Sequence, residues 1–450
     1  MTSLILVLPI LILSIGILVT YFLTLLHYSK NNQLSVFIER TTIILFLIFL
    51  IKPIIPPFSY LQPDALAGSD KTFVSAILQL AIYAFFIVLS KRLFRNFFGS
   101  LLLIFKDPFL GTLLILSLVS ALWSETPLLT LKFSLVQFFV SLFAAQIARR
   151  IDWNALQEYI LWMCLIAAIL SLLTCLAVPS IGIQGATRWS GIFPFPIKLG
   201  TCMALSITLW LNQLMYSSKQ RLVSISAISL SFFLLIKAAS AQAFFTLILL
   251  LSFLILLKFI KKFNPKQAAL VAVLLIFVFI PTYIGVTENL ESIFGVFGKD
   301  TTLTGRTEFW PQMFEALEKR PILGYGVEGF WQAWRGEQNP AGHIIISGGF
   351  APPNGHSGFL DLAMELGWFG LGLFAFSFVF NVSRAIRFWW QSTLVESMLP
   401  LLLLTYIFSA NISETQLFLS NYIWFFYVIV AVRLNLRAEK QPLPNITNFN

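Results

Sequence analysis

The chain has 450 residues, of which 58% are hydrophobic and only 11% are charged, and its mean hydropathy is +0.85. A soluble domain is typically about 25% charged, so this composition excludes an ordinary soluble enzyme and is typical of a protein with many membrane spans. The net charge of +10 does not indicate a nucleic-acid partner, because most lysines and arginines lie in short connectors between apolar runs, where the positive-inside rule explains them.

Long apolar runs recur along the whole chain, and each run of roughly 17–25 residues predicts a spanning helix. The runs lie near 3–26, 41–59, 72–90, 109–123, 128–148, 157–178, 196–216, 222–239, 243–260, 268–286, 359–383, 395–411 and 416–433. We therefore predict an all-α integral membrane protein, residues 1–450 forming one polytopic domain with about 12–13 transmembrane helices. Twelve is the alternative, because Lys52 and three prolines interrupt the second run. The first run is longer than that of a signal peptide and predicts a retained span.

The longest polar stretch, residues 287–358, is predicted to form a large loop outside the cytoplasm. If the C-terminal tail is placed inside, 19 of the 30 lysines and arginines fall on inner connectors and 10 on outer ones, with Lys52 in a span. This asymmetry agrees with the positive-inside rule. It also places the connectors 123–127, 179–195 and 411–414 on the outer face. The polar tail 438–450 is predicted to be a disordered cytoplasmic segment.

Within the loop, a helix is predicted from Glu308 to about Lys319, with Thr304 or Thr307 as its cap and Pro321 after its end. Its apolar face is suited to lying on the membrane surface. That face consists of Phe309, Met313, Ala316 and Leu317. The following glycine-rich segment predicts a turn leading to a second short element around 330–335.

Two outer-face arginines are candidates for binding an anion. Arg306 follows Gly305 at the predicted helix start, where a guanidinium lies beside unpaired backbone N–H groups, an arrangement that suits phosphate. The plainer interpretation is a solvated arginine or a pair with Glu308. Arg188 lies in another outer connector, and a charge between two apolar runs also serves as an interface anchor.

His356, where the loop re-enters the membrane, is the candidate base, because a neutral imidazole takes up a proton near neutral pH. A loop histidine is also often idle, and His343 is the competing candidate. Asp361 and Glu365 follow at helical spacing near the start of a span, and intramembrane carboxylates are functional candidates by default. Near the interface they would only bind water or pair with an arginine.

Metal and redox chemistry find little support in the sequence. The motifs Asp-x-Asp, His-Glu-x-x-His, the Walker loop and paired cysteines do not occur, and the three cysteines lie in apolar runs. Asp64 and Asp70 in the first outer connector could hold a divalent ion, but nothing around them in the sequence requires one. We predict no metal and no cofactor, with arginines as the counter-charge for a phosphate.

The order of these motifs resembles the O-antigen ligase and O-antigen polymerase superfamily over about residues 105–430. The motifs that carry the resemblance are Trp123-Ser-Glu-Thr-Pro127, Arg188-Trp-Ser-Gly191, Thr304-Gly305-Arg306 with Trp310, Pro321-Ile-Leu-Gly324-Tyr-Gly326, Asn354-Gly-His356, Glu365-Leu-Gly367-Trp-Phe-Gly370 and Glu414. Two positions depart from the family pattern. Gln242 follows Ser240 and Ala241 where relatives often have arginine, and Ser357 replaces a common asparagine.

The resemblance implies a membrane glycosyltransferase that takes a glycan from a polyprenyl diphosphate carrier and acts on the periplasmic face of the inner membrane. It implies that Arg188 and Arg306 bind the diphosphate and that His356 serves the acceptor hydroxyl. The remaining motif residues would contribute to substrate binding. These are Gly305, Trp310, Gly324, Gly326, Asn354 and Glu414.

Several readings stay open at this point. A ligase moves the glycan onto lipid A–core, whereas a polymerase moves it onto another lipid-linked repeat unit, and we favour the ligase slightly. A transporter of lipid-glycans or solutes is the alternative from another class, although it should show repeat symmetry and polar groups near the midplane. A non-catalytic assembly subunit would tolerate loss of Arg306 and His356.

Overall fold

The structure, a computed structural model, describes residues 32–51, 97–185, 187–216, 220–264, 267, 306–346 and 348–437, and these residues are mostly helical. Within these residues, five helices are long and apolar enough to cross a membrane, and four shorter apolar helices accompany them. This confirms the predicted all-α membrane class. The predicted spans near 3–26, 72–90 and 268–286, the end of the second span and the tail 438–450 lie outside the described residues.

The chain divides into two compact units. The first comprises residues 1–102, 139–244 and 420–425, and the second comprises 103–138, 245–419 and 426–450. The first unit contains α2 (Asn32–Leu50), most of α5 (Phe97–Ile104), half of α7 (Pro127–Arg150), α8 (Trp153–Ala177), α9 (Pro179–Gly182), α10 (Pro196–Tyr216) and α11 (Arg221–Ala238). The span predicted at residues 196–216 is confirmed, since it coincides with α10.

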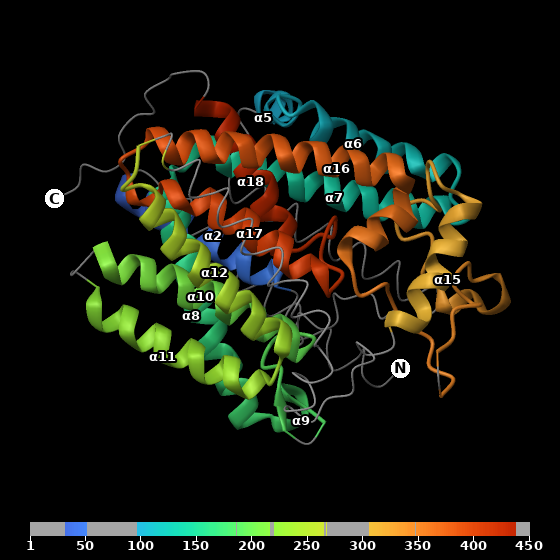
Figure 1. Cartoon of the computed structure of the whole chain (residues 1–450), viewed down its shortest axis with the longest axis horizontal. Helices are drawn as coiled ribbons and strands as arrows, with labels where there is room; N and C mark the ends of the chain where they lie inside the picture. The colour runs from blue at the N-terminus through green and yellow to red at the C-terminus, as the bar shows by residue number, and fades with distance from the viewer. Residues whose placement is uncertain are drawn as a thin grey trace. The chain divides into compact units, whose positions relative to one another are not determined.

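In the first unit, α10 and α11 pack against each other, and α8 packs on both (Figure 1). Buried polar side chains pair across these contacts. The Ser206 and Ser231 hydroxyls lie 2.8 Å apart, and the Gln157 amide donates to Gln213 at 2.9 Å. Between α9 and α10 the chain forms a two-stranded hairpin of β1 (Ile183–Gln184) and β2 (Arg188–Trp189), in which Gln184 pairs with Arg188. These hydrogen bonds satisfy polar groups that would be costly to leave unpaired in a membrane protein.

The second unit contains α6 (Pro108–Val119), η2 (Ser120–Leu122), most of α12 (Ala241–Ile260), α15 (Arg306–Lys319), η4 (Ala333–Gln338), α16 (Gly358–Gln391), η5 (Val395–Met398), α17 (Leu399–Ile412) and most of α18 (Tyr422–Arg437). Helices α6 and α16 lie side by side (Figure 1). The buried Asp107 caps α6 through the Leu110 N–H at 3.1 Å. Its other oxygen accepts from Ser377 and Asn381 of α16 at 2.6 and 2.7 Å, so one carboxylate joins the two helices.

Helix α15 confirms the predicted loop helix but corrects its placement. Its apolar face does not lie on a membrane surface, because Phe309, Met313, Ala316 and Leu317 are all buried. They form a small core with residues of the same loop and of the start of α16. The other members of this core are Tyr325, Phe330, Ala341, Ile344, Leu360, Ala363 and Met364. Burial of this face stabilises the loop against α16 through the hydrophobic effect.

Helix α16 is interrupted at Gly367, whose φ of 67° and ψ of −175° are accessible essentially only to glycine. The break leaves backbone groups on both sides without their helical partners. The turn 321–326 supplies replacements: Tyr325 and Gly326 N–H donate to the carbonyls of residues 364 and 365 at 2.9 and 2.8 Å. In return, the N–H groups of residues 368 and 369 donate to carbonyls of 321 and 322 at 2.8 and 3.3 Å. Four backbone hydrogen bonds therefore join the turn 321–326 to residues 364–369 of α16, and we call this junction the splice.

The last predicted span is wrong at its start. The apolar run 416–433 predicts a helix from residue 416, whereas α18 begins at Tyr422. The reason is Asn421, whose side-chain oxygen accepts from the N–H groups of Ile423 and Trp424, both at 3.0 Å, and so caps the helix there. Residues 413–421 instead form an irregular segment, which carries Glu414.

Candidate active site

The loop that carries His356 is held in a strained conformation at the N-terminus of α16. His356 has a φ of 46°, which is uncommon for a residue with a side chain. Its N–H donates to the Asn354 side-chain oxygen at 3.0 Å, and Ser357 caps α16 through the Leu360 N–H at 3.4 Å. Strain of this kind persists where the surroundings over-determine the backbone, often at functional sites.

Glu414 is one acidic neighbour of His356. The histidine Nδ1 lies 3.7 Å from the Glu414 Oε1, with 29% of the histidine side chain and 13% of the glutamate side chain exposed. This distance is an ion-pair separation rather than a hydrogen bond. The Gly358 N–H also donates to the Glu414 carbonyl at 3.2 Å, which ties the irregular segment to the start of α16. A carboxylate facing Nδ1 leaves Nε2 of the imidazole available for proton transfer.

Arg306, the first residue of α15, lies against the same irregular segment. Its guanidinium donates to the Ser413 carbonyl at 2.7 Å, next to Glu414. Burial lowers the pKa of the guanidinium, and the Glu414 charge partly offsets this effect. Among the described residues, the buried Arg306 Nε and the buried Ser413 hydroxyl have no hydrogen-bond partner. A partly desolvated cation with an unused donor is suited to binding an anion.

Two other predicted site residues support the histidine loop. The Trp310 indole N–H donates to the Gly355 carbonyl at 2.9 Å, and Asn354 accepts from the Thr415 hydroxyl at 3.2 Å as well as from the His356 N–H. These hydrogen bonds hold the backbone conformation of residues 354–356. The contribution of Trp310 and Asn354 to substrate binding, which the resemblance implies, stays a prediction.

Gly324 and Gly326 lie in the turn that is spliced into α16, with φ of 63° and 90°. A Cβ on Gly324 would meet the residue 364 carbonyl oxygen at 2.5 Å, so the close approach of the two backbones requires glycine there. The contacts described above link this turn to α16 rather than to His356. Gly305 lies outside the described residues.

Arg188 belongs to the first unit and is exposed on β2. It pairs with Gln184 through the hairpin backbone, and the neighbouring Trp189 ring contacts Lys237 and Phe233. The convergence of Arg306, His356 and Glu414 is thus a property of the second unit, whereas a joint role with Arg188 stays a prediction. The described residues hold no group of three or more histidines, cysteines, aspartates or glutamates arranged for a metal ion.

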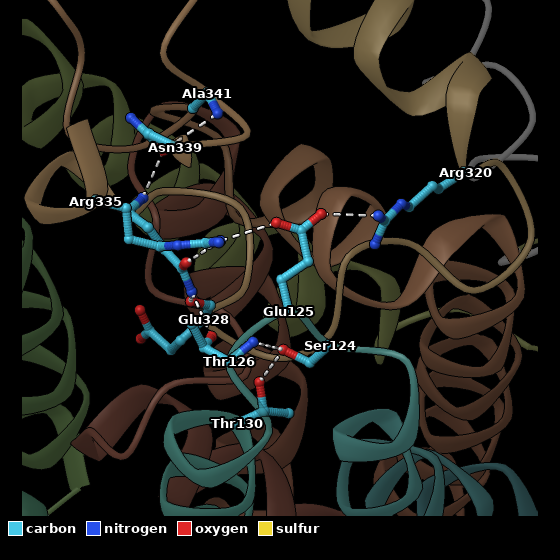
Figure 2. A network of polar contacts seen from close by, with 10 residues as sticks. Ser124, Glu125, Thr126, Thr130, Arg320, Glu328, Arg335, Asn339 and Ala341 are labelled. Carbon is cyan, nitrogen blue, oxygen red and sulfur yellow. Dashed lines mark hydrogen bonds and ion pairs between the residues drawn. The ribbon is translucent and has the colours of Figure 1, made fainter. Parts of the chain in front are cut away.

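A second polar cluster, which the sequence did not reveal, surrounds Glu125 in the connector after η2. Figure 2 shows its carboxylate between Arg320 and Arg335, each at 2.9 Å. Ser124 organises the connector by accepting from the Thr126 N–H and the Thr130 hydroxyl at 3.1 and 2.7 Å. The Trp123–Pro127 motif was visible in the sequence, but its partners lie about 200 residues away and carried no local signal.

The fold defines an all-α, multi-span membrane protein. Its candidate site, Arg306, His356 and Glu414, lies at the starts of α15 and α16 and just after the end of α17. Comparison with known proteins agrees: the O-antigen ligase family model matches residues 224–375, which include Arg306 and His356. The chain is also 35% identical over 83 residues to the exopolysaccharide production protein ExoQ of Rhizobium meliloti (strain 1021). That alignment covers 18% of this chain and 19% of the relative. These matches confirm the resemblance to the O-antigen ligase and polymerase superfamily.

Proposed function

We propose that this protein is a membrane glycosyltransferase that moves a glycan from a polyprenyl diphosphate carrier to an acceptor hydroxyl. The observation that carries the proposal is the convergence of Arg306, His356 and Glu414 within one unit, two of them inside the segment that the O-antigen ligase model matches. A candidate base and a cation both lie against residues 413–414. Displacement at a sugar carbon requires a base for the acceptor hydroxyl and a cation for the leaving group.

In the proposed reaction the acceptor oxygen attacks the anomeric carbon from the face opposite the diphosphate, which inverts the configuration. The carbon–oxygen bond to the diphosphate breaks as the new bond forms, and the acceptor proton passes to His356. Glu414 stabilises the resulting imidazolium from 3.7 Å. Arg306, with Arg188 as the second cation, stabilises the negative charge that develops on the leaving diphosphate. No metal ion is needed in this scheme.

The proposal places the site on the periplasmic face of the inner membrane, with residues 287–358 as the periplasmic loop of a single polytopic domain. Single cysteines at Gly336 and Gly348 should then react with an impermeant thiol reagent added from outside. Cysteines at Ser218 and Asn264 should react only after permeabilisation. The reverse pattern would contradict this orientation, which rests on the positive-inside rule.

The roles of Arg306 and His356 are tested by two variants assayed for donor affinity and turnover in one purified preparation. Arg306→Lys keeps the charge but loses the planar fork, and loss of one charge-assisted hydrogen bond of about 1.5–3 kcal/mol slows transfer roughly 10- to 150-fold. His356→Ala leaves donor affinity unchanged and lowers turnover about 10²–10⁴-fold. His343→Ala, at the exposed loop histidine, is the matched control and should transfer normally. Near wild-type turnover in His356→Ala would refute the proposal.

The acceptor has two candidates. Lipid A–core would make the protein a ligase, whereas another lipid-linked repeat unit would make it a polymerase. The second is favoured by the identity to a protein of exopolysaccharide production. Lipopolysaccharide from a deletion strain separates them: core without polymer indicates a ligase, and core that carries single repeats indicates a polymerase.

A further inference from the structure

Asp361, one turn into α16, is a buried carboxylate that the scheme above does not use. It is 5% exposed, and both of its side-chain oxygens accept hydrogen bonds. Its Oδ1 accepts from the Trp331 indole N–H at 2.7 Å and from the Gly355 N–H at 2.9 Å. Its Oδ2 accepts from the same Gly355 N–H at 3.0 Å and from the Thr415 hydroxyl. A buried charge is tolerated where several donors converge on it in this way.

Two of these donors are direct chain neighbours of the site residues. Gly355 precedes His356, and Thr415 follows Glu414. One carboxylate therefore joins the two segments whose side chains form the 3.7 Å pair. The Thr415 hydroxyl also lies 3.2 Å from the Asn354 side-chain oxygen, so the same hydroxyl contacts Asn354 before His356 and Asp361 after it.

The strained backbone at His356 explains why such a clamp is needed. Both backbone polar groups of Gly355 are bonded, its N–H to Asp361 and its carbonyl to the Trp310 indole. A Cβ on Gly355 would lie 2.7 Å from both the Asp361 Oδ1 and the Met313 Cε, so the turn is packed directly onto the carboxylate. Without these bonds, the residue that follows would relax from a φ of 46° toward an ordinary conformation and its imidazole would move.

We propose that Asp361 is a positioning residue that fixes the His356 imidazole relative to Glu414 and so sets the rate of glycan transfer. A carboxylate suits this place because its two oxygens accept from three donors, whereas an asparagine offers one acceptor oxygen and presents an N–H to the remaining donors. The effect on transfer rests on the proposed function, but the effect on His356 does not.

Asp361→Asn tests the inference in the full-length protein purified in detergent. Reaction with diethyl pyrocarbonate, followed by peptide mass spectrometry, gives the modification rate of His356 relative to the exposed His343 in the same molecule. We expect this ratio to change severalfold in the variant. Turnover with lipid-linked oligosaccharide should fall about 10- to 100-fold, since displacement of a reacting group by about 1 Å has effects of this size. Affinity for polyprenyl diphosphate should stay at the wild-type value.

Thr415→Val removes one of the donors and should shift the ratio and turnover in the same direction by less, which provides a second variant if Asp361→Asn does not fold. Glu365→Gln is the matched control on the same helix, because that carboxylate accepts from the Glu328 N–H instead and should leave the ratio unchanged. An unchanged ratio in both test variants would overturn the inference, as would normal turnover with a changed ratio. If the wild type transfers no glycan, the proposed function fails while the ratio still decides the role of Asp361.

Discussion

Replacement of Gly367 by alanine tests whether the splice, the four hydrogen bonds between the turn 321–326 and α16, stabilises the folded protein. At this residue a side chain meets two obstacles. The φ of 67° and ψ of −175° lie in a region that is essentially restricted to glycine. A Cβ would also lie 2.0 Å from the Ile322 carbonyl oxygen, a backbone atom that cannot move aside without breaking the splice.

The magnitude follows from these two effects. Backbone strain in this region costs about 1–3 kcal/mol. Each of the four hydrogen bonds of the splice contributes about 0.5–1.5 kcal/mol, so their joint loss adds about 2–6 kcal/mol. The expected destabilisation is therefore about 3–9 kcal/mol, with the upper end reached if the turn 321–326 separates completely from α16.

Thermal unfolding of the purified protein in detergent provides the measurement. Gly367→Ala should lower the apparent melting temperature by more than about 5 °C. Gly372→Ala is the matched control on the same helix: it has open space around its Cβ, and alanine should stabilise a helix interior by about 0.5–1 kcal/mol. If Gly367→Ala melts like the wild type, or if both variants lose stability equally, the reasoning about the splice is wrong.

Three further predictions concern charge, pH and metal. Glu125 and Arg335 should show a coupling of about 0.2–1 kcal/mol in a double-mutant cycle, because Glu125 is 40% exposed, and the coupling should shrink in high salt. Burial raises the pKa of the Tyr325 phenol, Arg320 lowers it and Glu125 raises it. The phenol therefore contributes fully to stability below about pH 10, and this contribution is lost as pH rises through its raised folded-state pKa. The difference in melting temperature between wild type and Tyr325→Phe should therefore shrink at alkaline pH. Glycan transfer should survive chelation by EDTA, and activity restored by one divalent ion would contradict this.

The helices that the sequence predicted well are those whose limits are local. The run 196–216 became α10 unchanged, because a proline begins it and polar residues follow it. The start of α18 was missed, since apolar residues continue on both sides of Asn421 and only its side-chain cap marks the boundary. The break at Gly367 was also invisible, because it depends on a turn about 45 residues earlier in the chain.

For the candidate site, residue type and motif order were sufficient to select Arg306, His356 and Glu414. In the structure, Arg306 and His356 both lie against the irregular segment 413–421, which carries Glu414. The contacts that hold them were not predictable. Asp361 was noticed as a carboxylate near the start of a span, but its donors Trp331 and Thr415 are ordinary loop residues without a pattern. Their importance arises only from the tertiary fold, which the periodicity of one segment does not encode.

The small core beneath α15 has a consequence for how this protein can be recombined with its relatives. Leu360, Ala363 and Met364 contribute to that core, yet they belong to α16 and precede its break at Gly367. A chimera joined at residue 358 would pair a foreign loop with the wrong helical turns and leave apolar surface unmatched. The unit that must be exchanged as a whole therefore extends from the loop through Gly367. A chimera with its crossover after that glycine should fold, whereas one with its crossover at residue 358 should not.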